Sequence, residues 1–137
     1  MAIAGVGTRF ERWDATLTTP AYVPLAEINS IEGPGMTRET IDTTALDTEG
    51  GYRTFITGFR DAGTITLNMN FTNATYSIIK GDFESNTPVK YQIIFPDEGN
   101  TTFQFEGLVT ECPVSIPMDD KISVSVTIKI SGTVEIV

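Results

Sequence analysis

The sequence predicts a mainly β domain, a sandwich or barrel with one flanking α-helix. Every second residue of 121–131 is apolar without a break, which is the pattern of a strand with one buried face. Residues 63–71 repeat this pattern. Helical spacing occurs only in residues 73–84. One helix among many strands favours two packed sheet layers or a closed sheet.

The first part of the chain contains weaker strand patterns. Residues 8–13 and 22–32 are strand candidates, and the second ends at the turn sequence Gly33-Pro34-Gly35. Residues 39–44 form a short further candidate. The stretch 46–60 is rich in glycine and lacks regular alternation, so we predict a long exposed loop there.

Residues 73–84 are predicted to form the helix, with Asn73 as the N-cap. Its apolar side, which includes Ile79 and Phe83, is expected to pack on the sheets. Residues 89–95 and 102–111 then flank a turn and predict a hairpin. Phe103 and Phe105 are expected to face the core, and Gly107 suggests a β-bulge.

The predicted loop is a candidate contact surface. It combines aromatic and arginine side chains with flexible glycines, a combination that an isolated monomer avoids. In an alternative interpretation, the aromatic side chains fold back over the domain as a satellite cluster. The loop residues predicted to contact another protein chain are Tyr52, Arg53, Phe55, Ile56, Phe59 and Arg60.

The sequence indicates no enzyme, resident metal or cofactor. It contains no histidine and a single cysteine, Cys112, which excludes imidazole bases, thiolate clusters and an internal disulfide. No phosphate-binding glycine motif is present. Acidic pairs such as Asp97-Glu98 and Asp119-Asp120 lie in turn-like stretches, where solvated carboxylates are common.

Composition favours a soluble single domain spanning residues 1–137, made in the cytoplasm. No apolar run is long enough to cross a membrane, and no secretory signal is visible. The net charge of -9 argues against binding nucleic acid through its phosphates. Such acidity suits a surface along which DNA slides, although many acidic proteins are acidic for solubility alone.

The chain resembles the tail tube (major tail) proteins of long-tailed, λ-like bacteriophages in three short sequence motifs that occur in the same order. These motifs are T-x-D-T, Y-R-T-F and G-F-R-D-A-G-T-I-T-L. The residues that carry the resemblance are Thr40, Asp42, Thr43, Arg53, Phe55, Gly58, Arg60, Asp61, Gly63 and Thr64. The resemblance implies a virion protein of the tail, whose copies form stacked hexameric rings. Sheets then join between subunits into an inner barrel that conducts double-stranded DNA during genome ejection.

The resemblance also implies partners and a lumen. Expected partners are the same chain and the tail terminator, tape measure and distal tail proteins, without a membrane. No additional immunoglobulin-like domain is expected at the C-terminus. In the predicted strand 121–131, Lys121 and Lys129 lie on the same polar face as the lumen candidates Ser123, Ser125 and Thr127. The candidate lumen-facing residues are Thr64, Thr66, Asn68, Asn70, Gln104, Glu106, Ser123, Ser125 and Thr127.

Two other functions remain open from the residues alone. The alternative is the inner tube of a contractile tail or of a secretion-system-like injection apparatus, which shares the fold that the resemblance implies. A third interpretation is a small acidic β-sandwich that binds calcium or carbohydrate. Assembly into tubes or rings distinguishes the first two from the third.

Overall fold

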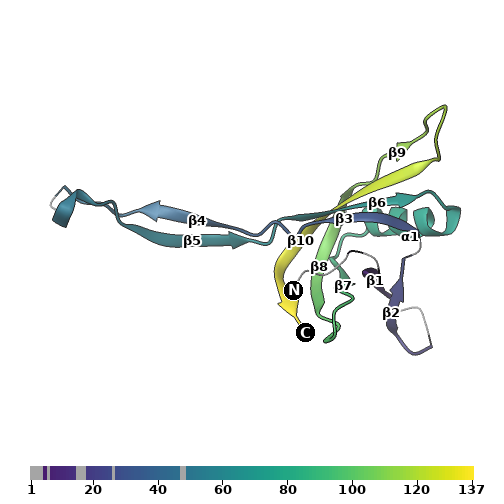
Figure 1. The fold of residues 1–137 in the computed structure, drawn as a ribbon, viewed down its shortest axis with the longest axis horizontal. Helices are drawn as coiled ribbons and strands as arrows, with labels where there is room; N and C mark the ends of the chain where they lie inside the picture. Colours follow the sequence, from purple (N-terminus) through teal and green to yellow (C-terminus); the bar gives the residue numbers. More distant parts are fainter. Residues whose placement is uncertain (1–4, 6, 15–17, 26, 47–48) are drawn as a thin grey trace.

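A curled eight-stranded sheet carries one α-helix and a two-stranded ribbon that projects far from it (Figure 1). The structure, a computed structural model, describes residues 5, 7–14, 18–25, 27–46 and 49–137. This arrangement confirms the predicted fold class. The elements are β1 Arg9–Asp14, β2 Ala21–Pro24, β3 Ile28–Glu32, β4 Thr37–Asp42, the 3-10 helix η1 Glu49–Gly51, β5 Phe55–Asp61, β6 Thr64–Asn70, α1 Asn73–Glu84, β7 Val89–Ile94, β8 Thr102–Glu111, β9 Val114–Ser115 and β10 Ser123–Ile136.

The stretch 22–32 forms two strands at opposite edges of the sheet, so the prediction of one strand was wrong. The strand order is β2-β1-β7-β8-β10-β6-β3, and β9 pairs with β10. Pro24 ends β2 because proline has no N–H to donate to a ladder. Glu27 then adopts a φ of 59°, which turns the chain away.

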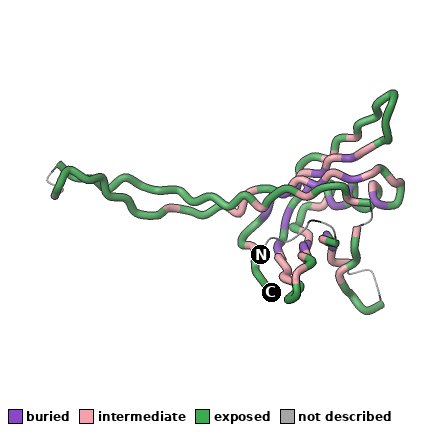
Figure 2. Tube along the Cα trace, viewed as in Figure 1, coloured by how far each residue is buried: buried purple, intermediate pink, exposed green. Residues whose placement is uncertain are grey.

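The core lies on the inner face of the curled sheet, and the buried residues, purple in Figure 2, are confined to this body. Strands β6 and β10 bury alternate residues together, since Leu67 lies opposite Val126 in their register. Phe103 packs against the core, whereas Ile122 precedes β10 and is exposed, contrary to the predicted alternation. The buried hydrophobic residues are Phe10, Ile65, Leu67, Met69, Ile79, Tyr91, Ile93, Phe105, Val109, Val124, Val126, Ile128 and Ile130.

The helix begins one residue earlier than its predicted cap implies. Thr72, not Asn73, is the N-cap, and its hydroxyl accepts a hydrogen bond from the backbone N–H of Thr75 at 3.3 Å. Ile79 is buried as predicted, but Phe83 is exposed. The helix is therefore rotated relative to the expected apolar side.

This rotation buries Asp82 at the junction of helix and sheet. The Asp82 carboxylate accepts hydrogen bonds from Arg12 on β1, at 2.7 and 2.5 Å, and from the Tyr91 hydroxyl on β7, at 2.8 Å. The hydrogen bond to Asp82 raises the pKa of Arg12, and burial raises the pKa of Tyr91. The Asp82 carboxylate thus links α1 to both β1 and β7 through hydrogen bonds.

Gly107 lies in a regular ladder and not in the predicted bulge. It pairs in register with both β7 and β10, and a register shift of the β8–β10 pair falls between Thr127 and Ile128. A Cβ atom at Gly107 would lie 2.5 Å from Cγ2 of Ile128 and 3.1 Å from the Lys129 carbonyl oxygen. Glycine is required here because the facing strand approaches so closely.

Candidate assembly surface

Strands β4 and β5 form a separate antiparallel ribbon, here called the arm (residues 36–61), which extends away from the body (Figure 1). Its register runs from Thr37 opposite Asp61 to Asp42 opposite Phe55. The prediction of an irregular loop over 46–60 was therefore wrong for its second half. Residues 43–54 connect the two strands and include the 3-10 helix η1, and 47–48 lie outside the described residues.

Both faces of the arm are open to solvent. All of β4 is exposed, and within β5 only Gly58 is partly covered (Figure 2). Phe59 is 87% exposed and Tyr52 78%, and Phe55 and Ile56 are also exposed. This excludes the alternative in which the aromatic side chains fold back over the domain. A two-stranded ribbon without a core is marginally stable alone, so these apolar groups call for a covering surface.

The distal end of the arm is held by local polar contacts. The Thr43 N–H donates to the Thr54 carbonyl at 2.9 Å, and the hydroxyl of Thr44 accepts from the Thr54 N–H at 2.8 Å. Arg53 pairs with Asp42 at 3.0 Å. Hydrogen bonds from Thr44 lower the pKa of Asp42, as does the bond from Arg53. The predicted contact residue Arg53 thus already has a carboxylate partner on its own arm.

At the root of the arm, two arginines lie directly opposite each other. Arg38 faces Arg60 across the ribbon, and like charges in such a pair repel. Arg38 donates to the Thr57 hydroxyl at 2.8 Å. Asp61 pairs instead with Lys129 of β10 at 2.9 Å, and that hydrogen bond lowers the pKa of Asp61. Among the described residues, the Arg60 side chain has no ion-pair partner.

Two hollows flank this root. One, of about 330 Å³, is lined by Phe59, Arg60 and residues of β4 and β10. The other, of about 350 Å³, contains both arginines beside apolar groups. Its lining residues are Met36, Thr37, Arg38, Arg60, Asp61, Ala62, Gly132, Thr133 and Val134. Glu39 lines the first hollow but not the second. The second hollow therefore combines apolar surface with two arginines that have no ion-pair partner among the described residues.

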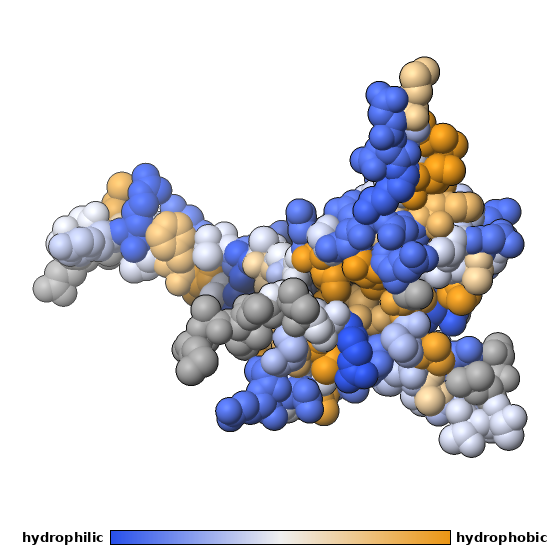
Figure 3. All heavy atoms as spheres, turned by 45° about the vertical axis from the view of Figure 1, so that its right-hand side comes forward, coloured by the Kyte–Doolittle hydropathy of each residue, from blue (hydrophilic) through white to orange (hydrophobic). Residues whose placement is uncertain are grey.

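A second projection leaves the body at the opposite end of β10 (Figure 1). It is formed by β9 and the start of β10, and its end, residues 116–122, is here called the tip. Met118 is 98% exposed and Ile116 74%. Asp119 and Asp120 follow them directly. Figure 3 shows this projection with apolar atoms along one side and hydrophilic atoms along the other.

The register places the predicted lumen residues on one face of the sheet, the face opposite the core. Asn70 lies opposite Ser123, and Thr66 opposite Thr127. Asn68 donates to the Ser30 hydroxyl at 2.9 Å, which joins the edge strand β3 to this face. Gln104 and Glu106 belong to the same face farther around the curl, where Glu106 lies opposite Ser131. Whether this face lines a lumen stays a prediction.

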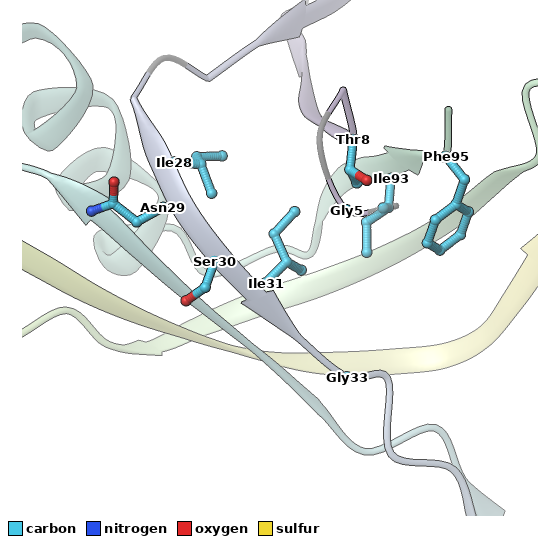
Figure 4. A pocket seen from close by; sticks show the side chains of 9 residues that line it. All are labelled: Gly5, Thr8, Ile28, Asn29, Ser30, Ile31, Gly33, Ile93 and Phe95. Carbon is cyan, nitrogen blue, oxygen red and sulfur yellow. The ribbon is translucent and has the colours of Figure 1, made fainter. Parts of the chain in front are cut away.

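A hollow larger than the two at the root lies elsewhere, between the edge strand β3 and the end of β7 (Figure 4). It measures about 520 Å³. Ile28, Ile31, Ile93 and Phe95 supply its apolar wall (Figure 4). No charged side chain lines it among the described residues.

Chemical sites of other kinds are not visible in the described part of the chain. No group of three or more potential metal ligands occurs among the described residues. The acidic turn at Asp97 is a local cap, since its carboxylate accepts from the N–H of Thr101 at 2.7 Å and from its hydroxyl at 2.5 Å. No helix among the described residues is long and apolar enough to span a membrane.

Comparison with known proteins identifies relatives of the whole chain. A family model described as "Lambda phage tail tube protein, TTP" matches residues 6–137. No curated protein matches the sequence. Among solved structures, the tail of an empty gene transfer agent particle with C6 symmetry superposes with a TM-score of 0.80 at 21% identity, over 99% of each chain.

Two further structures extend the fold to other tubes. A chain of the sheath-tube complex of an extracellular contractile injection system matches with a TM-score of 0.72 at 14% identity, over 100% of this chain and 92% of that one. The SPP1 tail tube matches with a TM-score of 0.70 at 10% identity, over 96% of this chain and 77% of that one. At such identities the likeness concerns the fold.

Proposed function

This chain belongs to the lambda phage tail tube protein family, and from that premise we propose that it polymerises as stacked hexameric rings into a hollow tail tube. Its place is then the tail of the particle. The role is structural, without turnover, cofactor or resident metal. Fold likeness to a gene transfer agent tail refined with C6 symmetry supports the sixfold arrangement.

The observation that carries the proposal is the exposed apolar arm. A ribbon with solvent on both faces and aromatic side chains along it gains stability only when another chain covers it. We assign the contacts between copies to the predicted set on this arm. That set is Tyr52, Arg53, Phe55, Ile56, Phe59 and Arg60.

Unpaired sheet edges support the same proposal. β2 pairs only with β1, and β3 pairs only with β6 among the described residues. Open edges of this kind pair readily with other chains unless they are protected. Closure of the sheets around a common axis removes the edges and forms an inner barrel.

The cargo proposed for the tube is double-stranded DNA during genome ejection. The face of β6 and β10 offers mainly neutral hydroxyl and amide groups, and the one lysine of β10 on it, Lys129, is paired with Asp61. The chain carries 18 acidic against 9 basic residues. A wall without clustered cations does not hold phosphates, so DNA slides past it. Asn68→Lys on this face should allow tubes to form but slow DNA release from particles, whereas Asn68→Gln should not slow it.

The alternative is the inner tube of a contractile apparatus, and the fold likeness to a sheath-tube complex supports it. The family match favours the non-contractile tail. A terminator at one end and a distal tail complex at the other are the partners that such a tube requires, with a tape measure protein inside.

Electron microscopy of concentrated purified protein tests the proposal. Tubes or sixfold rings are expected for the wild-type chain. Phe55→Asp and Phe59→Asp should remain folded monomers, because a charge replaces an apolar contact, while Phe59→Tyr keeps the ring and should assemble. Normal tubes from either aspartate variant, or wild-type protein that stays monomeric under all conditions, would refute the proposal.

A further inference from the structure

The arm root and the tip have complementary chemistry. The root holds a hollow of about 350 Å³ with Arg38, Arg60 and apolar walls. The tip presents two exposed apolar side chains, Ile116 and Met118, followed by Asp119 and Asp120. We propose that the tip of one subunit docks into the root hollow of a neighbouring subunit, a contact that rests on the polymerisation proposed above.

The occupant is a second copy because one chain cannot make this contact with itself. β10 begins next to the tip at Ser123 and reaches Gly132, which lines the hollow. That span is roughly 30 Å at about 3.3 Å per residue, and a continuous paired strand does not fold back. Figure 1 accordingly shows the two projections pointing in different directions from the body.

The charges of the lining residues favour the root hollow over the larger hollow beside β3 as the site that receives the tip. The larger hollow has no charged lining residue among those described, so it offers nothing to the two tip carboxylates. At the root, Asp61 is already paired with Lys129, while Arg38 and Arg60 repel each other across the ribbon. Two carboxylates between these guanidinium groups relieve that repulsion, although Lys121 offsets part of the charge of the tip.

The shapes fit the same arrangement. A hollow of about 350 Å³ holds roughly ten water molecules at about 30 Å³ each, enough space for Met118 and part of Ile116. Met36, Ala62 and Val134 line it and would cover these tip side chains. The tip and the root hollow lie at different places on the same chain. The contact between two copies is therefore head-to-tail, and each further copy can repeat it.

Charge reversal tests the contact. The double variant Asp119→Lys/Asp120→Lys and the double variant Arg38→Glu/Arg60→Glu should each raise the protein concentration needed for tube formation about tenfold or more. The chain that carries all four substitutions restores opposite charges and should assemble near the wild-type concentration. Glu84→Lys/Glu98→Lys is the matched control, since it makes the same change in net charge at exposed acids elsewhere and should assemble normally.

Circular dichroism melting verifies that every variant is folded. The inference is overturned if folded Asp119→Lys/Asp120→Lys assembles at the wild-type concentration, or if the four-substitution chain recovers nothing. Phe55→Asp, at the far end of the arm, separates this inference from the proposed function. Loss of assembly in Phe55→Asp with normal assembly of the tip variant rejects the docking contact alone, whereas normal assembly of Phe55→Asp rejects the role of the arm itself.

Discussion

Replacing Asp82 by alanine should remove the hydrogen bonds that link the helix α1 to the sheet, and should therefore destabilise the folded protein. Asp82 is 3% exposed, and its carboxylate is the acceptor for both Arg12 and Tyr91. Deleting it leaves the Tyr91 hydroxyl without this acceptor and leaves Arg12 with a long hydrogen bond of 3.4 Å to the Trp13 carbonyl. Breaking a buried pair costs about 3–5 kcal/mol, and because the Arg12 side chain remains 24% exposed, we expect a value near the lower end of that range.

Urea unfolding followed by circular dichroism measures this loss. With a slope of about 2 kcal/mol per molar urea, a loss of about 3 kcal/mol lowers the midpoint by roughly 1.5 M. The measurements belong in the Phe55→Asp background, so that assembly does not add to the apparent stability. Tyr91→Phe is the control. It removes one hydroxyl but keeps the ion pair, and it should cost only about 1 kcal/mol. The reasoning fails if Asp82→Ala costs no more than Tyr91→Phe.

Three further predictions use the same unfolding assay. Gly107→Ala should destabilise by about 1–3 kcal/mol because its methyl group meets Ile128, whereas Gly81→Ala, in an open helical position, should stabilise; equal effects would contradict the close approach. Burial raises the pKa of Tyr91, so its contribution is complete below the ordinary pKa of 10.0 and is lost as pH rises; Tyr91→Phe should flatten this alkaline decline. Hydrogen bonds lower the pKa of Asp97, so its contribution is present above the ordinary 3.8 and lost in acid; Asp97→Asn should abolish that part of the acid dependence.

Strands with one solvent-exposed and one buried face were predictable from the sequence. β6 and β10 alternate because one of their faces packs into the core, and burial dictates the residue pattern. β5 was missed for the converse reason. Both of its faces are exposed, so no burial selects alternate apolar residues, and Phe55, Ile56 and Phe59 obscure the pattern.

The candidate surface was predicted in part. The exposed aromatic side chains of the arm lie in the stretch that the sequence singled out, and the polar residues of β6 and β10 share one face as alternation requires. The pairing of Arg38 with Arg60 was not predictable, because it depends on a strand register that the sequence does not reveal. The exposed tip was not predicted either. The burial of Asp82 was hidden likewise, since its partners come from β1 and β7.

The ribbon of β4 and β5, which has no core of its own, sets how growth begins. The first contact between two free subunits must restrict the motion of this marginally stable hairpin, and that entropy cost opposes the earliest encounters. Later subunits join an end where neighbouring arms are already held in place. We therefore expect a lag before elongation and its removal by preformed seeds, so that a template, rather than subunit concentration alone, decides where and when a tube starts.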